Sequence, residues 1–160
     1  MSVLKIVTAP YDSPEAAANL IHYLYRQAHA IGGLSVDPAH AVEQMEMAQE
    51  CLCQTHGRLM YHFVLAFDPG ESKQIPCAQS LLYTAYEICG HFAEEYQIVF
   101  AIHQRDSRWH IHFAMNPVSL VTGRKYRADR AADNALAHAV RQTVYVSSLQ
   151  IVYGDCESLL

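Results

Sequence analysis

The stretch 103–116, HQRDSRWHIHFAMN, constrains the fold more than any other part of this chain. It holds three of the ten histidines, at the spacing His-x6-His-x-His. In a β-strand His110, His112 and Ala114 point to one face, and the apolar residues between them point to the other. The pattern therefore predicts a strand with one face in a core and two imidazoles side by side on its other face.

The preceding residues 97–103 also have the composition of a strand. A tight turn near Asp106 and Ser107 would place His103 opposite His110 on the same face of a hairpin. Three imidazoles that converge, and that leave coordination positions of the metal open, form a candidate site for divalent ions such as Zn, Mn, Ni or Co. Asp106 is a candidate for orienting one imidazole through a hydrogen bond. The alternative is that all three histidines simply face solvent.

Basic residues cluster around this motif although the whole chain has a net charge of −5. An anionic ligand responds to the local field, which is positive here because residues 105–130 contain only two acidic side chains. A solvated basic loop is the alternative interpretation. The basic side chains are Arg105, Arg108, Arg124, Lys125, Arg127 and Arg130.

The rest of the chain predicts one domain, residues 1–160, with an α/β (α+β) fold. Strands are expected over residues 4–8, 58–67, 97–103 and about 110–115, with a further short strand or a frayed end at 149–153. Helices are expected over residues 14–30, 38–54, 76–96 and 128–146 from apolar spacing and capping residues. This order predicts a largely antiparallel sheet flanked by helices. His62 interrupts an apolar strand, where a lone histidine is more often a satisfied core residue than a ligand.

Composition and missing motifs exclude several classes. No apolar run approaches the ~20 residues of a membrane span, and the N-terminus lacks a signal-peptide layout. Five cysteines without CxxC pairs indicate reduced thiols, so we expect a cytoplasmic protein with no membrane partner. Walker, GxGxxG, HExxH and GxSxG motifs are absent. A histidine-triad hydrolase would need a third alternating histidine where this chain has Ala114.

The histidine motif with its flank, HQRDSRWHIHFAMNPVSLVTGRKYR, resembles the metal-binding motif of the relaxase/mobilisation nuclease family of the HUH endonuclease superfamily. RLMYHFVLAFDPGE, residues 58–71, resembles the strand and turn before the long helix of that family. ANLIHYLYRQ, residues 18–27, resembles the helix that bears the catalytic tyrosine, here Tyr23. The resemblance covers about residues 5–130.

This resemblance implies a five-stranded antiparallel sheet flanked by helices, and a specific reaction. Family members nick one DNA strand at a plasmid or transposon transfer origin, leaving a 5′-phosphotyrosine. Tyr23 would be the nucleophile, with Tyr25 as the alternative, and His103, His110 and His112 would hold a divalent ion, usually Mg or Mn. The expected partners are single-stranded DNA and accessory mobilisation proteins.

The chain also departs from the family pattern. The Lys and Thr expected after the tyrosine helix are missing, Ala66 replaces a usual serine, and the motif ends in Asn116 without a further His-Asn pair. Three functions are therefore weighed. They are a DNA-nicking relaxase domain, a truncated or degenerate domain that binds DNA without nicking, and a three-histidine metal hydrolase that acts on a small substrate.

Overall fold

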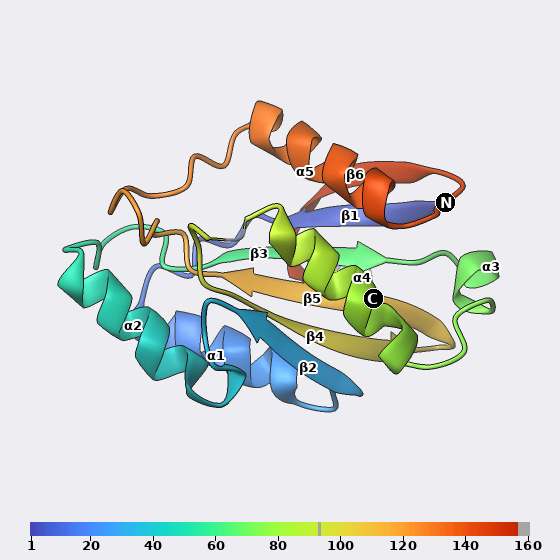
Figure 1. Ribbon diagram of the computed structural model, residues 1–160, viewed down its shortest axis with the longest axis horizontal. Helices are drawn as coiled ribbons and strands as arrows, with labels where there is room; N and C mark the ends of the chain where they lie inside the picture. The colour runs from blue at the N-terminus through green and yellow to red at the C-terminus, as the bar shows by residue number, and fades with distance from the viewer. Residues whose placement is uncertain (93, 157–160) are drawn as a thin grey trace.

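The centre of the computed structural model is a six-stranded sheet in the order β2-β4-β5-β3-β1-β6 (Figure 1). Neighbouring strands are antiparallel except β1 and β6, which run parallel. The structure describes residues 1–92 and 94–156. The strands are β1 (Ser2–Val7), β2 (Ala30–Leu34), β3 (Tyr61–Ala66), β4 (Ile98–Arg105), β5 (Arg108–Met115) and β6 (Leu149–Gly154).

Helices cover both faces of this sheet. One face packs against α1 (Pro14–Tyr25) and α2 (Ala41–Cys51), and the other against α4 (Gln79–Gly90) and α5 (Arg130–Thr143), which lie in front of the sheet in Figure 1. Two short turns of helix, η1 (Pro38–His40) and α3 (Pro69–Ser72), complete the described elements. No helix among the described residues is long and apolar enough to cross a membrane.

Strand β5 shows the alternation that its sequence predicts. Ile111, Phe113 and Met115 are fully buried in the core beneath α4 and α5, where Phe113 stacks on Phe63 with ring centroids 4.6 Å apart. Ala114 belongs to the core beneath α1 and α2. The two histidines of β5 therefore share the α1 face of the sheet, and a mixed α/β fold with a largely antiparallel sheet is confirmed.

The sheet has six strands instead of the expected five, and β2 was not predicted. The first helix was expected to reach about residue 30, but α1 ends at Tyr25 and Gln27 adopts a left-handed φ of 59°. A glycine just beyond residue 30 fits the end of the expected helix, yet Gly32 lies in β2 opposite Phe100 of β4. A Cβ atom at Gly32 would lie 2.3 Å from Cζ of Phe100, so this glycine allows the strand to pack against an aromatic ring.

Other boundaries shift by a few residues. The α4 and α5 helices are shorter than the expected 76–96 and 128–146, and the second helix starts with η1 and ends at Cys51. The turn at Asp106 and Ser107 is present, and both residues have positive φ, as a two-residue hairpin loop requires. The possible strand at 149–153 is β6, which pairs with β1 along its whole length.

Candidate metal centre

The register of the β4–β5 hairpin brings the three motif histidines together. His103 pairs directly with His110, and His112 lies two residues further along the same face of β5. The ring centroids of His103 and His112 are 4.7 Å apart, and those of His110 and His112 are 6.5 Å apart. The arrangement follows from the seven-residue spacing and the tight turn.

The histidines face an open cleft of about 460 Å³. Helix α1 packs on the neighbouring part of this sheet face, over Val99, Ala101 and Ala114. Its last turn borders the cleft, which is thus open to solvent on one side and backed by the sheet on the other. The cleft is lined by Tyr23, Arg26, Gln27, His103, Gln104, Arg105, His110 and His112.

Burial keeps these imidazoles neutral near pH 7. Loss of hydration lowers the pKa of His110 to about 4, and the nearby Arg108 charge adds to this effect. Burial also lowers the pKa of His103, and lowers that of His112 well below its usual value of 6.5. Neutral imidazole is the form that binds metal ions, so the three side chains are ready to act as ligands without first losing a proton.

Hydrogen bonds leave ring nitrogens available in this cluster. His103 donates from Nε2 to the carbonyl oxygen of Leu24, 2.6 Å away, so its Nδ1 carries the free lone pair. A backbone carbonyl is a usual partner for the second nitrogen of a metal-bound histidine. Nε2 of His112 is buried and has no hydrogen-bond partner among the described residues. Such an atom is costly unless something binds it, and a bound divalent ion is one way to satisfy it.

The two candidate tyrosines differ in position. Tyr23 lines the cleft, and its ring meets His112 edge-on with centroids 6.1 Å apart. Tyr25 lies outside the cleft lining, half-buried, and its hydroxyl donates to the carbonyl of Pro38 at 2.7 Å. Burial raises the pKa of Tyr25 to about 12. Of the two tyrosines, Tyr23 is the one that lines the cleft together with the histidines.

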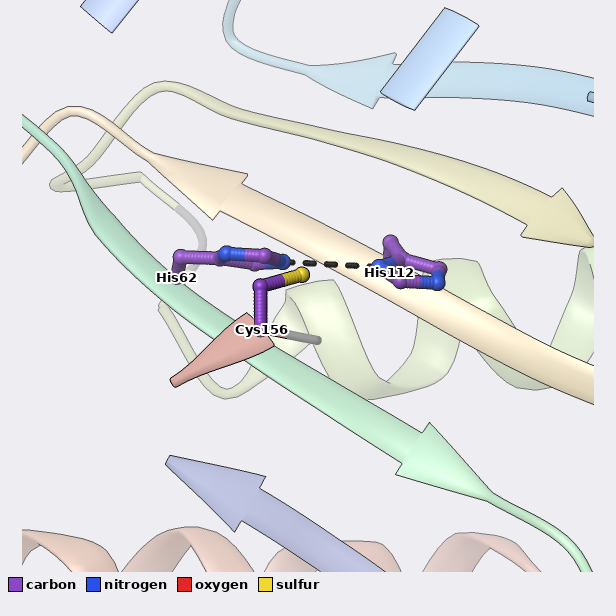
Figure 2. A group of neighbouring side chains, drawn as sticks. All are labelled: His62, His112 and Cys156. Atoms are coloured by element: carbon purple, nitrogen blue, oxygen red, sulfur yellow. Dashed lines mark hydrogen bonds between the residues drawn. The ribbon is translucent and has the colours of Figure 1, made fainter. Parts of the chain in front are cut away.

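The remaining candidates lie around or behind the cleft. Asp106 is exposed in the hairpin turn and does not line the cleft. Asn116 is fully buried, where its amide donates to Gln97 Oε1 at 2.9 Å and accepts from Gln49 at 3.2 Å. His62 of β3 stacks on His112 with ring centroids 5.7 Å apart (Figure 2). His62 is therefore a buried neighbour of the cluster.

The basic residues fall into two groups at opposite ends of β5. Arg105 lines the cleft and Arg108 lies next to it across the hairpin turn. Arg124, Lys125 and Arg127 follow the other end of the strand. Lys125 donates to the carbonyls of His56 and Arg58, and Arg127 pairs with Asp129 at 2.9 Å. Of the basic residues expected from the sequence, those at the cleft thus lie on the hairpin side, and Arg26 adds a positive charge from the end of α1.

Several cleft residues were not singled out from the sequence. Arg26 follows Tyr23 by three residues, which is the spacing of neighbours on a helix surface. This spacing could have indicated that Arg26 lies beside Tyr23. Gln27 and Gln104 carried no signal beyond adjacency to a candidate residue. Cys156 reaches this region only because β6 pairs with β1, which spacing along the sequence does not reveal.

Comparison with known proteins assigns the chain to a family. Residues 24–145 match the family described as relaxase, MobA/VirD2-like, nuclease domain. The chain belongs to the relaxase family. Two rlx proteins of Staphylococcus aureus are each 25% identical to this relaxase domain over 125 residues, which cover 78% of the chain and 38% of the relative. A third rlx protein is 24% identical over 137 residues, 86% of the chain and 39% of the relative.

The chain thus spans about two fifths of the length of these curated relatives, and no solved structure matches it. The family match confirms the resemblance noted in the sequence. It includes His103, His110 and His112, and Tyr23 lies immediately before its first residue. Relaxases are generally metal-dependent and act on DNA, and the helix-flanked mixed sheet is consistent with the relaxase fold.

Proposed function

We propose that this relaxase domain nicks one strand of DNA at the transfer origin of a mobile element, using Tyr23 as the nucleophile. The observation that carries the proposal is the position of Tyr23. Its ring lies edge-on to His112 in the cleft that His103 and His110 also line. A phosphodiester in this cleft would meet a phenol, three neutral imidazoles and the side chain of Arg105.

His103, His110 and His112 would hold a divalent ion, Mg or Mn by family resemblance, while Zn, Ni or Co also suit imidazole ligands. Once bound, the ion neutralises charge on the non-bridging phosphate oxygens. The hydrogen bond from His103 to the Leu24 carbonyl ties β4 to the helix turn that carries Tyr23. This contact positions the nucleophile relative to the histidines.

The proposed reaction is a transesterification. The phenolic oxygen of Tyr23 forms a bond to phosphorus, and the bond from phosphorus to the 3′-oxygen breaks. The phenol loses its proton and the departing 3′-oxygen gains one, so the proton count is unchanged. One phosphodiester replaces another, which keeps the step reversible and allows rejoining. Arg26 and Arg105 line the same cleft and would pair with phosphates of the bound strand.

Covalent trapping tests the proposal. The protein is incubated with Mn²⁺ and labelled single-stranded oligonucleotides that tile the DNA flanking its own coding sequence. We expect a denaturation-resistant adduct, with the phosphate located on Tyr23 by mass spectrometry. Tyr23→Phe should abolish the adduct. Tyr25→Phe should retain it, because that hydroxyl contacts the Pro38 carbonyl outside the cleft lining. An adduct that survives Tyr23→Phe would refute the assignment.

The same assay separates nicking from simple binding. A degenerate relaxase that only binds DNA would give no adduct with any oligonucleotide but would still show salt-sensitive binding. In that case Arg105→Ala should weaken binding, since Arg105 lines the cleft, and Arg127→Ala should have a smaller effect, since Arg127 is paired with Asp129.

A further inference from the structure

A second set of metal-ligand atoms meets behind the three-histidine cluster. One ring nitrogen of His62, one of His112 and Sγ of Cys156 all lie within 4.8 Å of one another. Figure 2 shows the two rings lying end to end, His62 on β3 and His112 on β5, with the sulfur of Cys156 beside the dashed line that joins their nitrogens. We propose that His62, His112 and Cys156 form a separate binding site for one thiophilic divalent ion, such as Zn²⁺ or Co²⁺.

The spacing of the two ring nitrogens, which Figure 2 marks as a hydrogen bond, also matches shared coordination of one ion. Nε2 of His62 and Nδ1 of His112 are 3.4 Å apart, beyond the usual length of a nitrogen hydrogen bond. Two nitrogens on one tetrahedral zinc ion, each about 2.0–2.1 Å from it, are about 3.3–3.4 Å apart. Both histidines are fully buried, so their rings are held in this relation by packing.

Cys156 completes the set from a different strand. It follows β6, and it needs to approach the rings by only about 1 Å to reach the nitrogen-to-sulfur separation of about 3.6 Å around zinc. The ammonium group of Lys5 on β1 lies close enough for its charge to interact with Cys156. Sulfur also selects softer ions than Mg or Mn.

Tyr11 orients His62 for this role. Its hydroxyl lies 2.8 Å from Nδ1 of His62. When Nδ1 donates its proton to the Tyr11 oxygen, Nε2 keeps a free lone pair directed at His112. An oxygen acceptor on the second ring nitrogen is the usual arrangement around histidines that bind metal.

Because both sites would use His112, they cannot hold an ion at the same time. This consequence alone rests on the proposed function. A neutral imidazole has one free lone pair, so coordination through Nδ1 leaves the proton on Nε2. His112 then cannot serve His103 and His110. The chain should accordingly hold one ion at a time in the two sites.

Cobalt binding by the full chain tests the site, because a thiolate bound to Co²⁺ gives a charge-transfer band in the near ultraviolet. We expect the band at one equivalent of Co²⁺. Cys156→Ser should abolish it, and Cys53→Ser, which removes an exposed thiol, should leave it unchanged. His62→Ala should also abolish the band, and His62→Gln keeps the size of the side chain if the alanine variant fails to fold. A band that survives Cys156→Ser would overturn the proposal.

His103→Ala separates this site from the one used for nicking. We expect the band to persist in His103→Ala, because His103 is not among its donors, even if the DNA adduct is lost. Loss of the band in this variant would show that Cys156 joins the three-histidine site instead, and would overturn the separate site. Binding of two Co²⁺ ions by the unmodified chain would refute the exclusivity. Absence of the adduct with the band present would refute nicking alone.

Discussion

Acidification should destabilise this fold steeply between pH 6 and pH 5, before its carboxylates titrate. Burial lowers the pKa of His62 to about 3 and of His110 to about 4, and lowers that of His112 well below 6.5. In the unfolded chain each has a pKa near 6.5. The unfolded state therefore binds more protons than the folded state in this range, so stability rises with pH and falls on acidification.

The size of the effect at pH 5 depends little on the folded pKa values, provided that they lie below 5. Each histidine should lower the free energy of unfolding by about 2 kcal/mol at pH 5. This pH lies about 1.5 units below the unfolded pKa, and each unit corresponds to about 1.36 kcal/mol. Three such groups give about 6 kcal/mol, comparable with the ~5–15 kcal/mol total stability of a typical domain. Near pH 5.5 the free energy of unfolding should change by about 1 kcal/mol per pH unit for each histidine.

Urea unfolding in EDTA between pH 5 and pH 8, followed by fluorescence of the buried Trp109, measures this slope. His62→Gln, His110→Gln and His112→Gln should each remove about a third of it. His56→Gln, an exposed control, should leave it unchanged. The slope of the free energy of unfolding against pH reports proton binding. A loss of stability that a substitution causes equally at every pH leaves this slope unchanged. A slope that none of the three buried substitutions reduces would refute the reasoning.

Two further substitutions, Gly32→Ala with Gly90→Ala as its control and Asp133→Ala, test the packing, and each is measured by urea unfolding at pH 7.5. Gly32→Ala should destabilise by about 1–3 kcal/mol because its Cβ would overlap Phe100, whereas Gly90→Ala, with nothing within 4 Å, should stabilise by up to ~1 kcal/mol. Equal effects would contradict the close approach of β2. Asp133→Ala should cost about 1–3 kcal/mol because it leaves the buried hydroxyl of Tyr61 without its 2.8 Å acceptor, and a neutral result would show that the hydroxyl finds another partner.

The sequence predicted best what depends on local spacing. Strand alternation, the turn at Asp106 and the convergence of the three motif histidines all follow from residues within one hairpin. Tyr23 was the preferred nucleophile from the resemblance, and the hydrogen bond of Tyr25 to Pro38 adds a geometric reason to separate the two. Those roles still await the adduct assay.

Long-range contacts account for what the sequence did not reveal. Gly32 has the same local signature in a helix stop and in a strand, and only the ring of Phe100 across β2 and β4 distinguishes them. His62 was interpreted as a core residue, and its stacking on His112 depends on β3 pairing with β5. Cys156 depends on the still longer-range pairing of β6 with β1.

The parallel pairing of β1 with β6 also orders events during synthesis. Strands β4 and β5 are adjacent in sequence and can pair as soon as they emerge, whereas β6 can join β1 only after residues 149–154 have been made. Contacts between distant segments form slowly because a long loop must close first. On the ribosome the histidine hairpin can therefore form before the thiol of Cys156 reaches it.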